Sequence, residues 1–396
     1  MRLWVLALVG GLLWVMPAMA ADPAAVNEAG NRAFRGANPD DAAAVALWRQ
    51  AAALGSAPAS ANLGVAYELG RGVPQDAAVA AEWYRRGMAQ RDPFATLSLA
   101  MLTLDGRGVP RDEVEGARLA RVAADAGWAA AQSTMGVLYE AGRGVPADQD
   151  LAVTWLRRAA AQGFAEAEKN LGIHYEQGRG AEHDPAEAAR LYELAARQGL
   201  ADAQLRLGVA YEIGRGVKLD DRVAVGWFEK ATAQGNAVAT WRLGSHAESG
   251  AGRRQDYAET MALYRRAADQ GLAPAQNAVG GLFEDGHGVA KDPAEAVRWC
   301  RLAAEQGYAP AERQLGLHAM DGNGMEADDG EAFRWFNAAG AQNDGVSELY
   351  LALLHVTGRG TAPDRNEARR WLKLAAESDI VEIRDQAQAA LAQMGR

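Results

Sequence analysis

Paired glycines recur along this chain at a fixed interval of 36 residues, as in Gly142-Arg143-Gly144. The first glycine of each pair stands at nine positions without a gap: Gly70, Gly106, Gly142, Gly178, Gly214, Gly250, Gly286, Gly322 and Gly358. A period of this length indicates a repeat protein, in which each unit buries its apolar face against its neighbours. It favours an extended interaction surface over one enclosed active site.

The unit from Gly127 to Gly163 predicts two helices joined by the glycine turn. In the first, Ala131, Met135 and Tyr139 share one face at helical spacing. The second opens on Asp148, whose carboxylate suits a helix N-cap, and glycine ends it in the left-handed conformation. We therefore expect an all-α fold of 36-residue helix-turn-helix repeats.

The same residue types return in every unit as columns. A tryptophan column on the second helix could be a ligand platform, but leucine replaces it in several units, which favours a core position. The core columns are Ala59, Ala95, Ala131, Ala167, Ala203, Ala239, Ala275 and Ala311 with Leu63, Leu99, Leu171, Leu207, Leu243, Leu315 and Leu351; the N-caps are Asp40, Asp76, Asp112, Asp148, Asp184, Asp220, Asp256, Asp292, Asp328 and Asp364; the tryptophans are Trp83, Trp155, Trp227, Trp299, Trp335 and Trp371.

Residues 1–20 have the pattern of a signal peptide. Arg2 precedes an apolar run from Leu3 to Val15, and Ala18-Met19-Ala20 forms an A-x-A cleavage site. The run is shorter than the ~20 residues that span a bilayer, which argues against an uncleaved anchor. We expect a periplasmic or secreted protein, mature from about Ala21, with no membrane span and one solenoid over 21–396: about ten helix pairs and a closing helix.

The charge balance is acidic, with 51 Asp and Glu against 41 Lys and Arg. This argues against nucleic acid as a partner, because phosphates require a basic surface. Cys300 is the single cysteine, so no intramolecular disulfide can form. It follows a tryptophan where other units have Tyr or Phe, and we expect it to be a buried packing residue.

The pattern A-x-x-x-L-G-x-x-Y-x-x-G-x-G-V, an aspartate and then W-Y-x-x-A-A-x-x-G resembles the Sel-one-like repeat (SLR), a relative of the tetratricopeptide repeat, from about Asp40 to Ala376. The resemblance implies a right-handed α-α superhelical solenoid whose first helices line the concave side. It also implies an adaptor or regulator of other proteins, often exported by bacteria. Cysteine-rich members are associated with β-lactams, but their paired cysteines are absent here.

Catalytic and metal-binding signatures are missing from the sequence. His174, His246 and His318 share a column in alternate units, but helix packing would place them about 20 Å apart, too far for one metal. No G-x-S-x-G, S-x-x-K or H-E-x-x-H motif occurs. We expect no enzyme activity, no cofactor and no bound metal.

Three columns lie half a turn from the buried face of the first helix, beginning at Ser133, Val137 and Glu140. One is varied, one apolar and one acidic, which suits a groove for a peptide or helix. The alternative is packing between neighbouring first helices. The predicted partner-binding residues are Val137, Glu140, Lys169, Ile173, Glu176, Val209, Glu212, Trp241, Glu248 and Arg313.

Arginines also form a row in the turns, at Arg71, Arg107, Arg143, Arg179 and Arg215, resuming at Arg359. They could bind an acidic partner. Alternatively each pairs with the glutamate three residues before it, as Arg143 with Glu140.

These features together favour an exported protein–protein interaction scaffold or regulatory adaptor of the bacterial cell envelope, which binds a partner protein or peptide on its concave face. Two alternatives remain: a protein that binds or hydrolyses cell-wall material or β-lactams, and a secreted factor that contacts a host protein.

Overall fold

The computed structural model describes residues 22–36 and 38–394, so the predicted signal peptide lies outside the described residues. Within those ranges the chain forms 21 α-helices and no strand. The helices are α1 (Pro23–Arg35), α2 (Asp41–Ala53), α3 (Ala57–Leu69), α4 (Ala77–Ala89), α5 (Pro93–Asp105), α6 (Glu113–Asp125), α7 (Ala129–Ala141), α8 (Gln149–Ala160), α9 (Ala165–Gln177), α10 (Pro185–Arg197), α11 (Ala201–Ile213), α12 (Asp221–Ala233), α13 (Ala237–Ser249), α14 (Tyr257–Ala268), α15 (Ala273–Asp285), α16 (Pro293–Ala304), α17 (Ala309–Asp321), α18 (Asp329–Gly340), α19 (Gly345–Thr357), α20 (Arg365–Ala375) and α21 (Val381–Met394).

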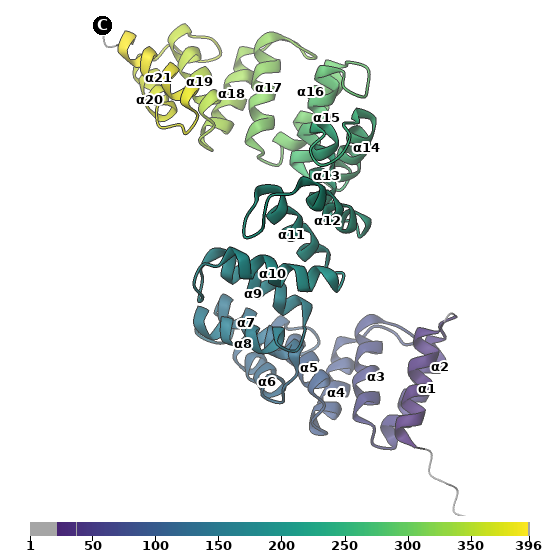
Figure 1. Cartoon of the computed structure of the whole chain (residues 1–396). Coiled ribbons are helices and arrows are strands. Elements are labelled where there is room, and N and C mark those ends of the chain that lie inside the picture. Colours follow the sequence, from purple (N-terminus) through teal and green to yellow (C-terminus); the bar gives the residue numbers. More distant parts are fainter. Residues whose placement is uncertain (1–21, 37, 395–396) are drawn as a thin grey trace, which may run out of the picture. The chain divides into compact units, whose positions relative to one another are not determined.

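Odd-numbered helices up to α19 are the first helices of the repeats, and each is followed by an even-numbered second helix (Figure 1). First and second helices pack as antiparallel hairpins, for example α7 on α8, and a second helix such as α6 also packs on the next first helix. The closing helix α21 begins 36 residues after α19, in the register of another first helix. The predicted all-α solenoid of helix pairs is confirmed.

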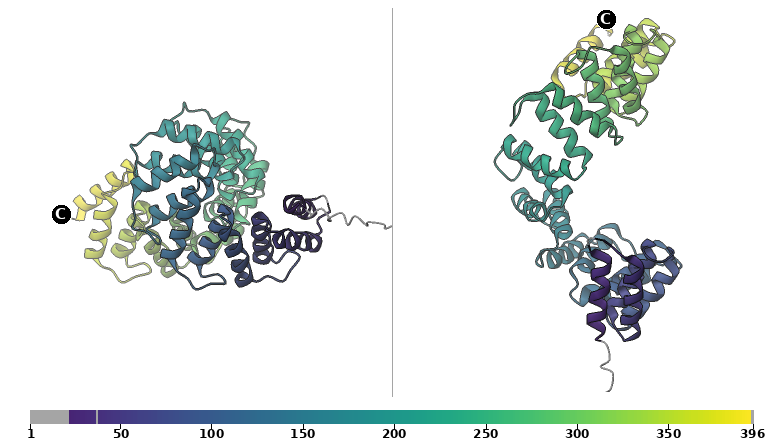
Figure 2. Two further views of the ribbon diagram at one scale, coloured as in Figure 1. Left: turned by 90° about the horizontal axis from the view of Figure 1, so that it is seen from below. Right: turned by 90° about the vertical axis from the view of Figure 1, so that its right-hand side faces the viewer.

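The helices group into two units. The N-terminal unit comprises the described chain up to His174 together with the turn residues Gly178–Glu182. The C-terminal unit comprises Tyr175–Gln177 and the described chain from His183 onward. Successive hairpins can be followed within each unit in Figure 2. The prediction of one domain over 21–396 stays a prediction.

The predicted core columns are confirmed. All eight alanines of the first column are 0% exposed, and the seven leucines of the second are at most 4% exposed. Each of the ten aspartates accepts a hydrogen bond from a backbone N–H in the first turn of its second helix. Trp155 and Trp371 are buried, whereas the other four tryptophans of their column are only half-buried.

Glycines allow both the turns and the close approach of paired helices. Gly142, the first glycine of its turn, ends α7 at φ 66°. Inside α3, a Cβ on Gly64 would lie 2.3 Å from the ring of Tyr84 on α4. Arg91 and Asn343 stand where other units have a glycine between repeats, and both hold the same left-handed conformation at φ 63°.

Candidate functional site

The predicted partner-binding residues lie on first helices of both units, and within each unit we call the positions of the three columns the first-helix face. Val137 is 43% exposed, and the other nine are half-buried. Val137 and Glu140 lie on α7; Lys169, Ile173 and Glu176 on α9; Val209 and Glu212 on α11; Trp241 and Glu248 on α13; and Arg313 on α17. Their role in binding a partner stays a prediction.

Part of the apolar column packs between neighbouring helices. Val209 of this column contacts a buried cluster that contains Phe228 and Leu243. In the varied column, Trp241 likewise contacts a cluster that contains Tyr264 and Val279. At other positions the column remains open to solvent, as at Val137. Packing therefore accounts for part of this column, and binding at its exposed positions stays a prediction.

The acidic column makes contacts within the chain, which the sequence did not reveal. In three units the hydroxyl of a second-helix tyrosine donates to the glutamate of the same unit: Tyr84 to Glu68, Tyr192 to Glu176 and Tyr264 to Glu248, at 2.7–2.8 Å. Burial is the main cause that raises the pKa of each tyrosine, and the glutamate hydrogen bond adds to it. These glutamates therefore hold the two helices of a hairpin together.

In three further units a buried histidine of the next repeat faces the glutamate. The Nδ1–H groups of His174, His246 and His318 donate to backbone carbonyls five residues later, at 2.8–3.0 Å. Their Nε2 atoms lie 3.6, 3.2 and 3.8 Å from Glu140, Glu212 and Glu284. This histidine column, considered in the sequence only as a metal site, connects adjacent repeats instead.

The contact at Glu212 is close enough for a hydrogen bond, and its carboxylate is the main cause that raises the pKa of His246. Both ring nitrogens of the protonated histidine can donate, one to Ala251 and one to Glu212. Protonated His246 therefore stabilises the folded chain. Because its folded pKa is raised, this contribution to the free energy of unfolding is complete below the unfolded pKa of about 6.5 and is lost as pH rises through the folded pKa.

Glu212→Gln should lower the pKa of His246, because the amide removes the negative charge that favours the imidazolium. NMR titration of the histidine Cε1–H resonances checks this. The resonances of His174 and His318, which face other glutamates, serve as internal controls. A His246 titration unchanged by the substitution would contradict the pairing.

The turn arginines bind acidic groups of the preceding repeat. Arg143 pairs with Asp105 and Glu113, so the predicted pair of Arg143 with Glu140 is wrong. Glu140 instead forms an ion pair with Arg179, 3.0 Å away. The equivalent pairs are Arg71 with Asp41, Arg107 with Glu68, Arg215 with Glu176 and Arg359 with Asp329. The arginine chain is long enough to reach one repeat back, a contact that spacing along one helix could not show.

The two basic residues predicted on the first-helix face also have partners. Lys169 lies 2.8 Å from Glu166 on the same helix, and Arg313 pairs at 2.5 Å with Asp344, the N-cap of α19. Arg242 lies beside the ring of Trp241 and pairs with Glu212. The charged groups of this face are thus largely neutralised within the chain, so its apolar parts have the greater potential to bind a partner.

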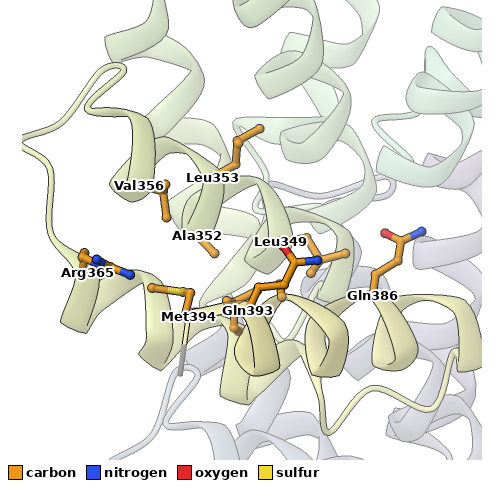
Figure 3. A pocket seen from close by; sticks show the side chains of 10 residues that line it. Leu349, Ala352, Leu353, Val356, Arg365, Gln386, Gln393 and Met394 are labelled. Carbon is orange, nitrogen blue, oxygen red and sulfur yellow. The ribbon is translucent and has the colours of Figure 1, made fainter. Parts of the chain in front are cut away.

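A groove of about 460 Å³ lies on the first-helix face between α19, α20 and α21 (Figure 3). Leu349 and Leu353 belong to the varied and apolar columns, and Leu353 and Val356 are 46% and 51% exposed. We call this hollow the C-terminal groove; it is completed by Ala352, Arg365, Leu372, Gln386, Ala390, Gln393 and Met394. Sequence reasoning missed it because α21 contributes one wall and was considered only as a closing helix.

Within the described ranges, no three side chains of His, Cys, Asp or Glu are grouped to hold a metal ion. Cys300 is buried as predicted, and burial raises the pKa of its thiol to about 12, which makes it a poor nucleophile. None of the helices in residues 22–36 and 38–394 has the length and apolarity needed to cross a bilayer.

Comparison with known proteins agrees with the repeat count. A family model described as Sel1 repeat matches residues 23–56, 57–91, 93–128, 129–164, 165–200, 201–236, 237–272, 273–308, 309–344 and 346–379. No curated protein matches the chain.

Two solved structures are similar over most of the chain. One is a protective antigen present in uropathogenic Escherichia coli strains, with an SLR fold; it is 29% identical, and the match covers 94% of this chain and 90% of the antigen with a TM-score of 0.59. The other, a Sel1 repeat protein from Oxalobacter formigenes, is 30% identical over 78% of this chain and 89% of its own, with a TM-score of 0.60.

Proposed function

Because the chain belongs to the Sel1 repeat family, whose repeats generally mediate protein–protein interactions, we propose that it is a non-enzymatic scaffold or adaptor of the bacterial cell envelope. Its first-helix face, concave in the family, binds an apolar segment of a partner protein. Export is supported by the signal-peptide pattern of residues 1–20. It is also supported by the description of one similar structure as a protective antigen.

The observation that carries this proposal is the C-terminal groove. Its walls combine buried Leu372 with exposed Leu353 and Val356, and polar side chains such as Gln386 and Gln393 lie at its edge. An apolar floor with a polar rim is the arrangement that binds an amphipathic helix or an extended peptide. Most charged groups elsewhere on the first-helix face already have partners within the chain.

A photo-crosslinking amino acid at Leu353, in living cells, tests this function. We expect it to form a discrete adduct with a partner protein, and Val356→Glu to abolish that adduct because it replaces an exposed apolar contact of the groove with a charge that an apolar ligand would have to desolvate. Trp241→Ala tests whether the first-helix face of α13 also takes part.

The same crosslinking amino acid at Val114, which is 71% exposed on the second helix α6, is the matched control for non-specific crosslinking at the protein surface. Equal adducts from both positions, or none from Leu353, would contradict binding in the groove. Fractionation of the same cells reports separately whether the mature chain is exported.

A further inference from the structure

A second hollow, in the N-terminal unit, lies where the repeat lacks two of its large side chains. The tyrosine at the end of the first helix is replaced by Thr103, and the tryptophan of the second helix by Leu119. Both residues line a pocket of about 320 Å³ formed by α4, α5, α6 and the turn between α5 and α6. We call it the Thr103 pocket.

Two other units in which a small residue replaces the tyrosine have a larger residue in the turn. Where Ala247 replaces it, the turn valine becomes Arg253, whose side chain is 18% exposed and pairs with Glu259. Where Ala319 replaces it, the turn residue is Met325, which packs against the cluster containing Ala319. At Thr103 the turn residue remains Val109, so the lost volume is not replaced from the turn.

The remaining units show what shape fits this space. Five of them have Tyr or Phe at the position of Thr103, and in the next repeat Tyr139 packs against the same core cluster as Leu119. These five residues are Tyr67, Tyr139, Tyr175, Tyr211 and Phe283. The walls around Thr103 therefore match a phenyl or phenol ring.

The lining of the pocket is suited to such a ligand. Leu99 and Leu119 are 4% and 5% exposed and form an apolar floor, and the hydroxyl of Thr103 is satisfied by the carbonyl of Leu99. Met88 forms one wall, and its unbranched thioether adapts to aromatic neighbours. The volume exceeds the ~150 Å³ that suffices for benzene in an engineered protein cavity.

The charged rim leaves one group available. Arg118 pairs with Glu115 at 2.6 Å, and Asp112 caps α6. Arg85 has no hydrogen bond or ion pair with the residues that the structure describes, and it lies at the pocket edge. A carboxylate next to the bound ring would pair with this guanidinium.

We propose that the Thr103 pocket binds the side chain of a phenylalanine or tyrosine in a partner protein, with an acidic group beside it at Arg85. This inference rests on the proposed scaffold function in one respect, namely that the bound side chain belongs to a partner protein. The pocket itself can be tested without any partner.

The probe is N-acetylphenylalaninamide, titrated into the mature chain by ligand-observed NMR, with N-acetylleucinamide for comparison. We expect the aromatic probe to bind at least fivefold more tightly. Thr103→Tyr, which restores the residue of neighbouring repeats, should weaken its binding at least tenfold. Leu119→Trp should do the same from the opposite wall, and N-acetylphenylalanine should bind more tightly than its amide unless Arg85 is changed to Gln.

Thr357→Tyr, the same substitution at an exposed position of α19, is the matched control and should leave probe binding unchanged. Circular dichroism of every variant establishes that the helices are retained. Equal binding of the leucine probe, no binding of either probe, or full binding to folded Thr103→Tyr and Leu119→Trp would overturn the proposal. A crosslink at Leu353 without probe binding would refute the pocket alone, and probe binding without the crosslink would refute only the groove.

Discussion

Gly144→Ala should destabilise the N-terminal unit by about 3–5 kcal/mol, among the largest effects expected for a single methyl group. Gly144 has a φ of 71°, which costs an alanine about 1–2 kcal/mol. Its added Cβ would also lie 1.9 Å from the carbonyl oxygen of Glu113, at the start of α6 in the preceding repeat. The backbone there is fixed in a helix, so the repeats must separate to relieve the contact. Thermal unfolding followed by circular dichroism measures the loss.

Gly163→Ala is the matched control, because it makes the same substitution at a φ of 76° where no atom lies within 4 Å of the new Cβ. It should cost only the backbone strain, about 1–2 kcal/mol. The difference between the two variants isolates the contact between repeats. Equal losses would contradict the view that the second turn glycine is required for stacking.

This glycine shows how far the sequence could go. Its 36-residue period predicted the repeats, the helix pairs and the ten aspartate caps, because each of these depends on neighbours in the chain. The sequence assigned the turn glycines to local conformation, and for Gly142 that is right. At Gly144 the stronger constraint is Glu113 of the preceding repeat, and no local pattern encodes that distance.

The candidate site was predictable to a smaller extent, for the same reason. Opposite faces of one helix can be inferred from its periodicity, which correctly placed Val137 away from the core. Whether Glu140 faces solvent depends on His174 and Arg179, each more than 30 residues later. The C-terminal groove depends on α21, whose sequence lacks the glycine turn that marks other repeats.

A buried polar column that the sequence left unnoticed leads to a second large effect. In several units a glutamine 30 residues later donates to the column residue, among them Gln162 to Gln132, Gln234 to Gln204, Gln306 to Gln276 and Gln342 to Glu312, at 2.7–2.9 Å. In the last unit the column residue is Glu348, 3% exposed, and the donor position is occupied by Ser378. The shorter side chain leaves this carboxyl group without the amide donor.

Burial raises the pKa of Glu348 from 4.5 to about 7, and the nearby carboxylates of Asp344 and Glu377 contribute. Asp344 is itself paired with Arg313 of α17. Because the folded pKa lies above the unfolded one, the folded chain binds the extra proton between these values. The stabilisation from Glu348 is therefore complete below about pH 4.5 and is lost as pH rises to about 7.

Glu348→Gln should remove this loss, since an uncharged glutamine already occupies the equivalent position in three other repeats. We expect the free energy of unfolding of the variant to exceed that of the wild type by an amount that grows from near zero at pH 4.5 to about 3 kcal/mol above pH 7. This follows from 1.36 kcal/mol for each pKa unit. Hydrogen exchange of the α19 amides, compared between the two proteins at each pH, measures the difference.

Two further variants determine whether the missing donor is the cause. Ser378→Gln restores an amide at the donor position, so it should lower the pKa of Glu348 and reduce the difference between Glu348→Gln and its parent. Glu312→Gln, in a unit that retains Gln342, should increase the free energy of unfolding by a smaller amount. Burial raises the pKa of Glu312, but the hydrogen bond from Gln342 lowers it. A gain from Glu348→Gln that is constant from pH 5 to pH 8 would show that packing, and not the proton, sets the stability of the last repeat.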